Sequence, residues 1–209
     1  MGADRIQAFP PSAVSVVDEP GALSVDSTLG QLFVINKANQ AVAARAAAQV
    51  LPAQTPLTTI TTAQTMLTLN FAAGELNAVG RTISIFGSIV FTSPAATPTI
   101  TIAVKLGATT LCTITSAAVA GSQTNAQLQF EFELTTASTG ASGSIEAHGA
   151  IGVQLSATLS TALAWYADQN TAATGSLNLT TAEALTVTIA ASSTITSATL
   201  RQSVIEMVA

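Results

Sequence analysis

Residues 127–135 are Gln-Leu-Gln-Phe-Glu-Phe-Glu-Leu-Thr, an unbroken alternation of polar and apolar side chains. Successive side chains of a β-strand point to opposite faces, so Leu128, Phe130, Phe132 and Leu134 would share one face, with the glutamates on the other. This alternation predicts a strand with one face buried and one face in water. The stretch therefore indicates a sheet that packs against a core.

The same alternation recurs on both sides of this stretch. It is found in residues 65–71, 81–91, 99–106, 109–115, 145–155 and 200–208, and more briefly around 163–165, 177–179 and 185–189. Gly107-Ala108 suits a two-residue hairpin, and Gly149 and Gly152 indicate a bulge or a close backbone approach inside their strand. About eight strands joined by Gly, Pro, Ser and Asn turns predict an all-β fold, an antiparallel jelly-roll-like β-sandwich.

The first part of the chain has a different composition. Residues 1–28 contain three prolines and four acidic residues with only scattered Val and Leu, and Pro52 and Pro56 then mark a linker. We therefore expect an extended N-terminal arm over residues 1–55 and the jelly-roll domain over 56–209. Within the arm, residues 31–35 and 41–45 are compatible with a small hairpin. The alanine-rich stretch 39–50 is alternatively compatible with a helix.

Composition excludes several classes of protein. Only 8% of the 209 residues are charged, and six Lys and Arg residues give a net charge of −5, so few cations are present to neutralise phosphates and nucleic acid is not an expected partner. No window has the roughly 18 consecutive apolar residues of a membrane helix, and residues 1–20 lack the pattern of a signal peptide. With one cysteine, an intrachain disulfide and a thiolate metal cluster are excluded.

Two pairs of side chains on the strand surfaces invite a functional interpretation. Glu131 and Glu133 are two apart on an outward face, as a carboxylate pair of a glycosidase could be, but two solvated acids explain them better, since no sugar pocket is evident nearby. Glu146 and His148 could bind a metal or respond to pH, especially if three copies met at an axis. A surface or interface histidine is the simpler explanation.

The remaining candidates are Cys112 and the segment around Trp165. Cys112 lies in a strand pattern and is most simply a small buried residue, because a nucleophile would need a base. Trp165, Tyr166 and Asp168 could form a loop that contacts a ligand, although core or subunit-interface packing of Trp165 is the more frequent use of such a residue. No catalytic residue, cofactor site or metal site is predicted.

The body of the chain, over roughly residues 57–209, resembles the jelly-roll modules of tailed-bacteriophage virion proteins: head decoration (cement) proteins, head fibres and some tail-fibre tips. The arm segments 29–36 and 39–43 resemble, more loosely, strand-turn-strand pieces of phage fibres. The residues that carry the resemblance in the body are Leu76-Asn77-Ala78-Val79-Gly80-Arg81-Thr82-Ile83, Ile85-Phe86-Gly87-Ser88-Ile89, Thr97-Pro98-Thr99-Ile100-Thr101-Ile102, Lys105-Leu106-Gly107 and Ala198-Thr199-Leu200-Arg201-Gln202-Ser203-Val204-Ile205-Glu206.

The resemblance implies a structural protein and no enzyme. It implies a homotrimer on the exterior of a virus capsid that decorates and stabilises the shell, with the major capsid protein of a tailed phage as partner. Contact would run through the arm, for which we expect Phe9, Leu32, Phe33, Ile35 and Arg45 to matter. The alternative is a receptor- or glycan-binding head on a tail or head fibre, in which the segment from Trp165 makes the contact. A secreted polysaccharide-active enzyme is disfavoured by the shortage of acid-base candidates.

Overall fold

The computed structural model describes residues 7–9, 23–26, 31–35, 41–44, 49–51, 55–156, 163–168 and 173–208, with side chains described from 55 to 207 within these ranges. The chain divides into two compact units, Met1–Gln49 and Val50–Ala209. Every described element is a β-strand. Among these residues there is no helix with the length and hydrophobicity that crossing a membrane requires.

The first unit is a four-stranded sheet of its own, with strand order β1-β2-β3-β4. Its strands are β1 (Gln7–Phe9), β2 (Leu23–Asp26), β3 (Gln31–Ile35) and β4 (Ala41–Ala44). β1 pairs with β2 in parallel, and β2 with β3 and β3 with β4 antiparallel. Ala41–Ala44 is thus a strand and not part of the helix considered as the alternative for 39–50. The proline-rich composition gave no signal for β1 and β2.

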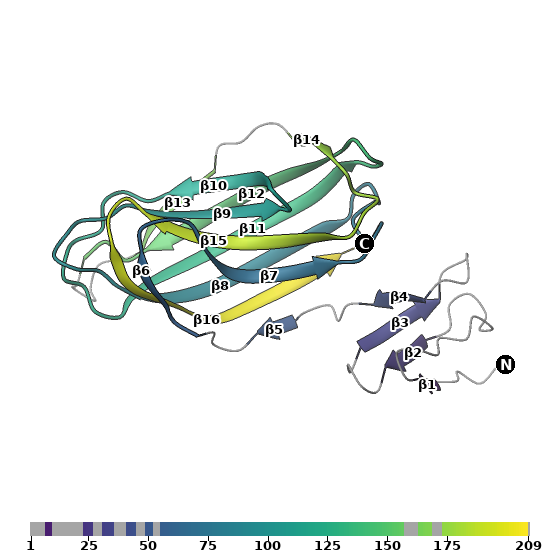
Figure 1. Ribbon diagram of the computed structural model, residues 1–209, viewed down its shortest axis with the longest axis horizontal. Coiled ribbons are helices and arrows are strands. Elements are labelled where there is room, and N and C mark those ends of the chain that lie inside the picture. The colour runs from purple at the N-terminus through teal and green to yellow at the C-terminus, as the bar shows by residue number, and fades with distance from the viewer. Residues whose placement is uncertain are drawn as a thin grey trace. The chain divides into compact units, whose positions relative to one another are not determined.

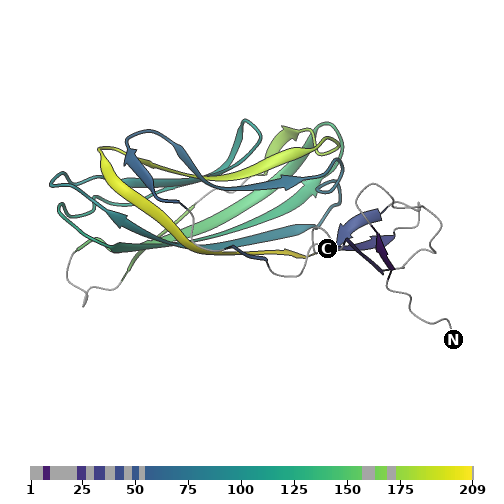
Figure 2. The same ribbon diagram turned by 60° about the horizontal axis from the view of Figure 1, so that its bottom comes forward.

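The second unit is a sandwich of two sheets, visible as two layers in Figure 2. The smaller sheet has the order β10-β9-β15-β7, and all its pairs are antiparallel. Its strands are β7 (Gln64–Phe71), β9 (Ile100–Leu106), β10 (Thr109–Thr115) and β15 (Glu183–Ala191). Gly107, with φ of +56°, opens the two-residue hairpin between β9 and β10 that the sequence predicted.

The larger sheet has the order β13-β12-β11-β8-β16-β5 (Figure 1). β14 also pairs with β12, and β6 also pairs with β16. The strands are β5 (Gln49–Leu51), β6 (Leu57–Ile60), β8 (Thr82–Thr92), β11 (Ala126–Ser138), β12 (Gly143–Val153), β13 (Ala164–Ala167), β14 (Thr174–Leu177) and β16 (Ile195–Val208).

The chain crosses repeatedly between the sheets. β8 and β11 are neighbours in the larger sheet, although the hairpin β9–β10 that separates them in sequence lies in the smaller one. The strands near the two ends of the second unit alternate between the sheets in the same way. β7 pairs with β15 in the smaller sheet, and β8 pairs with β16 in the larger one. These crossovers are of the Greek-key kind, and the predicted all-β, antiparallel jelly-roll-like sandwich is confirmed.

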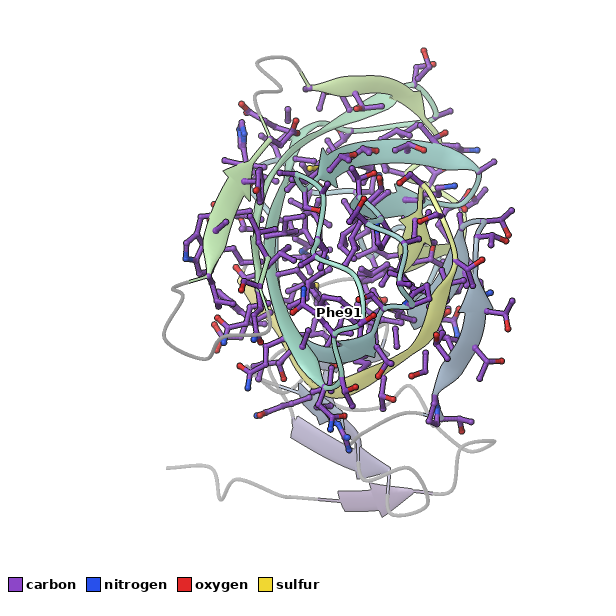
Figure 3. The ribbon with its side chains drawn as sticks, turned by 90° about the vertical axis from the view of Figure 1, so that its left-hand side faces the viewer. Phe91 is labelled. Atoms are coloured by element: carbon purple, nitrogen blue, oxygen red, sulfur yellow. The ribbon has the colours of Figure 1, made fainter. Side chains whose placement is uncertain are left out.

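The core fills the space between the sheets, and Figure 3 shows Phe91 enclosed by both layers. The faces predicted to be inward are the buried ones, as in β11, where Leu128, Phe130, Phe132 and Leu134 are all buried. One exception is β7, where the pairing with β15 shifts register next to Met66, so Met66 and Leu67 are both buried.

Two glycines of the larger sheet lie directly opposite phenylalanines. Gly87 pairs with Phe130, and a Cβ placed on Gly87 would lie 2.2 Å from Phe130 Cζ. Gly149 pairs with Phe132, and a Cβ placed there would lie 2.4 Å from Phe132 Cδ1. Each ring therefore occupies the space that a side chain would take on the neighbouring strand. Gly149 is accordingly a close approach and not a bulge, since the register with β11 is regular around it.

Candidate functional site

The outward face of the larger sheet carries a row of aligned side chains. Strand register places side chains from β13, β12, β11, β8 and β16 across from one another in two adjacent rows. The first row is Trp165, Gly152, Gln129, Ser88 and Gln202, and the second is Ala167, Ala150, Glu131, Phe86 and Val204. Because β12 contributes only glycine and alanine, the surface is low between Trp165 and β11.

A groove of about 270 Å³ lies along these rows. Its lining combines two exposed aromatic side chains with two amides, two hydroxyls and a carboxylate. The lining residues are Phe86, Gly87, Ser88, Gln129, Phe130, Glu131, Trp165, Gln202, Ser203 and Val204. Three of the lining residues face the core and form the floor of the groove: Gly87, Phe130 and Ser203.

Trp165 lies flat on the sheet. A Cβ placed on Gly152 would be 3.0 Å from both Cε2 and Cζ2 of the indole and 3.2 Å from Cδ2. Nearly equal distances to three bonded ring atoms put the glycine beneath the face of the six-membered ring and not at its edge. The side chain remains 55% exposed. One face of the indole is therefore packed against the backbone of β12 while the other is open to solvent.

Phe86 is the second exposed aromatic residue of this face, with 44% of its surface accessible. Glu131 lies directly opposite it on β11, and Val204 lies opposite it on β16. Three inter-strand spacings of about 4.8 Å separate the strand of Trp165 from the strand of Phe86. The polar groups between the two aromatics can donate and accept hydrogen bonds, since Gln offers both functions and a carboxylate accepts only.

The structure separates the three residues that the sequence placed in one ligand-contacting loop. Trp165 and Tyr166 lie in strand β13 and not in a loop. Only Trp165 lines the groove, because Tyr166 is opposite Ile151 and packs against the core. Asp168 also points away from the groove, since its carboxylate accepts a hydrogen bond from the thiol of Cys112 at 3.1 Å.

Cys112 is a buried thiol in β10 of the smaller sheet. Burial, the hydrogen bond to Asp168 and the charge of that carboxylate, in this order, raise the pKa of the Cys112 thiol far above its usual range. The thiol therefore stays protonated, which is the opposite of what a nucleophile requires. The interpretation of Cys112 as a small buried residue is supported, and it links the two sheets as well.

The acidic and histidine side chains near the groove are exposed on the same face of the larger sheet. His148 Nε2 lies 3.1 Å from Glu146 Oε1, both side chains are exposed, and His148 is opposite Glu133 on β11. Within the ranges that the structure describes, no three His, Cys, Asp or Glu side chains gather closely enough to hold a metal ion. Glu131 and Glu133 lie in successive rows, and only Glu131 lines the groove.

The residues expected to contact a capsid lie in the first unit. Phe9 is in β1, and Leu32, Phe33 and Ile35 are in β3, but their side chains lie outside the described residues, as does the whole of Arg45. Their role as contacts remains a prediction.

Sequence reasoning missed Phe86, Ser88, Gln129, Gln202 and Val204 as members of one site. One signal was available for Phe86, because the alternation that points Ile85 and Gly87 inward points this phenylalanine outward. A large aromatic side chain on the wet face of a strand is unusual enough to mark a surface. The alignment with Trp165 depends on strand order across five strands, which alternation does not contain.

No protein-family model and no curated protein matches this sequence. Among solved structures there is a likeness to the VP2 subviral particle of infectious bursal disease virus, at 16% sequence identity and a TM-score of 0.26, covering 81% of this chain and 44% of the viral one. The Gx strain of the same virus gives 14% identity and a TM-score of 0.25, covering 80% and 42%. The chain thus spans less than half the length of these proteins, and a likeness of this degree assigns neither family nor function.

Proposed function

We propose that this chain is a non-enzymatic structural protein of a virus particle, which decorates and stabilises the capsid of a tailed phage as a homotrimer. The observation that carries the proposal is the division into two compact units, Met1–Gln49 and Val50–Ala209. The described core of the second unit runs from Ile60 to Ile205, so the sandwich has a core of its own. In this proposal the first unit attaches the protein to the shell and the second unit faces the particle exterior.

The composition of the surface supports the same role. The outward positions of the sandwich carry mostly Thr, Ser, Gln and Ala, and the whole chain has six Lys and Arg residues. Binding that is specific for the assembled shell stabilises the shell by mass action, without any chemistry. The strands of the first unit offer backbone donors and acceptors for pairing with a partner chain, in addition to their side chains.

The test compares the full chain with a chain that begins at residue 50, on particles stripped of this protein. We expect both forms to have the same trimeric mass by light scattering and the same far-ultraviolet circular dichroism of a β-sandwich. Only the full chain should co-sediment with particles and raise their resistance to heat. Saturation of particles by the truncated chain would contradict the assignment of attachment to the first unit, and a monomeric full chain would contradict the trimer.

A receptor- or glycan-binding head on a tail or head fibre is the second candidate. The groove on the second unit favours it, because two exposed aromatic side chains, Trp165 and Phe86, lie there beside amide and carboxylate groups. Electron cryomicroscopy of the native particle separates the two functions. Density over the shell at local threefold positions supports decoration, while density confined to the tail or to a fibre tip supports the head.

A further inference from the structure

We propose that the groove on the outward face of the larger sheet binds a neutral oligosaccharide of pyranose sugars, with Trp165 as the stacking platform and Glu131 as the main hydrogen-bond acceptor. The inference concerns the sandwich alone. It does not depend on decoration of a capsid, and it holds for either location of the protein on a particle.

The first argument is the position of the indole. An aromatic face carries partial negative charge and attracts the C–H groups on the apolar face of a pyranose ring. A ring that must first be ordered loses affinity, because binding then has to offset the side-chain entropy. Gly152 already supports the indole of Trp165 from below, so the platform is flat and in place with one face open.

The second argument is the spacing and chemistry of the polar groups beside the platform. Gln129, Glu131 and Gln202 extend from β11 and β16 into the groove, and all three are exposed. Sugar hydroxyls both donate and accept, and two adjacent hydroxyls can donate to the two oxygens of one carboxylate. Phe86 lies at the far side of these groups and provides a second apolar contact for a ring further along the ligand.

The third argument is charge, which selects the class of sugar. The exposed charged groups of this sheet face include four carboxylates, with Arg201 and the imidazole of His148 beside them. The carboxylates are Glu131, Glu133, Glu146 and Glu206. A sulfated, sialylated or uronic-acid glycan would meet like charge, whereas a neutral glycan would not.

A second copy of this chain is a less suitable occupant. The core of a protein interface is depleted in charged residues, and a stable interface buries about 800 Å² on each partner. Here Glu131 stands between the two exposed aromatics, so the apolar surface is divided into separate patches. The polar side chains of β11 lie between the aromatic side chains of β13 and β8, an arrangement that suits a chain of sugar rings better than a protein core.

The experiment uses the full-length protein on an array of immobilised neutral, sulfated, sialylated and uronic-acid glycans, followed by calorimetry with the neutral glycan that binds best. Trp165→Ala should weaken binding by roughly tenfold or more, which corresponds to about 1.4 kcal/mol, and Trp165→Phe should restore part of it. Glu131→Gln should weaken binding by a comparable factor. Glu133→Gln is the matched control, since it removes the same charge from the same strand one row outside the groove, and it should bind as the wild type does.

The proposal would be overturned by an array on which the protein binds no glycan or only anionic ones, or by binding that survives both Trp165→Ala and Glu131→Gln. It would also be overturned if Trp165→Ala changed the oligomeric mass by light scattering and no glycan bound, because the face would then be a contact between copies. Circular dichroism of each variant verifies that the fold is retained. Failure of the array leaves the particle-binding result of the truncated chain unaffected, so the two proposals fail separately.

Discussion

Replacing Gly87 with alanine should destabilise the sandwich, although alanine is ordinarily the better strand residue. The new Cβ would lie 2.2 and 2.4 Å from Cζ and Cε1 of Phe130, far inside van der Waals contact. Phe130 is 2% exposed and packed in the core, so its ring cannot move away without disturbing its neighbours. Overpacking of this kind costs about 1–3 kcal/mol.

The origin of the cost can be isolated with a second substitution. Phe130→Leu removes the ε and ζ carbons that the new Cβ meets, at a cost of its own from the lost burial. In that background Gly87→Ala should be neutral or stabilise by up to about 0.5–1 kcal/mol, because alanine loses less backbone entropy than glycine. The two substitutions should therefore be coupled by more than about 1 kcal/mol, well above the usual error of additivity.

The assay is urea denaturation of the full chain followed by far-ultraviolet circular dichroism, at one protein concentration for all variants. Gly175→Ala serves as the control, since no atom lies within 4 Å of a Cβ placed there, and it should change the free energy of unfolding by less than about 0.5 kcal/mol. If Gly87→Ala lowered the free energy of unfolding equally in the wild type and in the Phe130→Leu background, the steric reasoning would be refuted.

Substitutions at three further positions test other parts of the structure. Burial and Asp168 hold the pKa of the Cys112 thiol above the ordinary 9.0. Above about pH 9 the folded chain therefore keeps a proton that the unfolded chain loses, and the free energy of unfolding should fall as the pH rises. Cys112→Ala should lessen that fall in urea titrations between about pH 8 and about pH 10, and an unchanged slope would contradict the assignment. Gly107→Ala, at φ of +56°, should cost about 1 kcal/mol in the same assay while Gly107→Asn costs less, and equal stability of the two would count against a left-handed requirement. Gly152→Ala should push the indole of Trp165 away from β12, so that acrylamide quenches the fluorescence of Trp165 more strongly. Unchanged quenching would contradict the contact.

Much of the sandwich could be predicted from sequence because the long strands are buried mainly on one face. Alternation then reports directly which side chains enter the core, as Leu128 and Ile85 illustrate. It fails where a strand carries an extra residue, and Met66 is an example, since the register shift beside it buries two consecutive side chains. Such a shift depends on the pairing partner, which a local pattern does not include.

The candidate site was predictable only in part. Trp165 is conspicuous in any inspection of the sequence, and its neighbourhood in the chain suggested that Tyr166 and Asp168 act with it. The strand conformation instead sends Tyr166 to the core, and Asp168 is satisfied by Cys112, a residue of the other sheet. The residues that do accompany Trp165 come from β8, β11 and β16, and they are brought together by strand order. Non-local pairing of this kind cannot be derived from periodicity.

The pairing of β16 has a consequence for how the protein is made. β16 lies beside β8, with Ile205 opposite Ile85 and Val208 opposite Thr82, so the two partners are separated by more than half of the chain. Until β16 has left the ribosome, β8 has an open edge and the apolar face of the larger sheet is incomplete. Topologies dominated by such distant contacts fold slowly, and their unfinished forms are prone to aggregation. The larger sheet is therefore complete only once β16 has been made, and a chain that stops before β16 should expose the edge of β8 and be prone to aggregation.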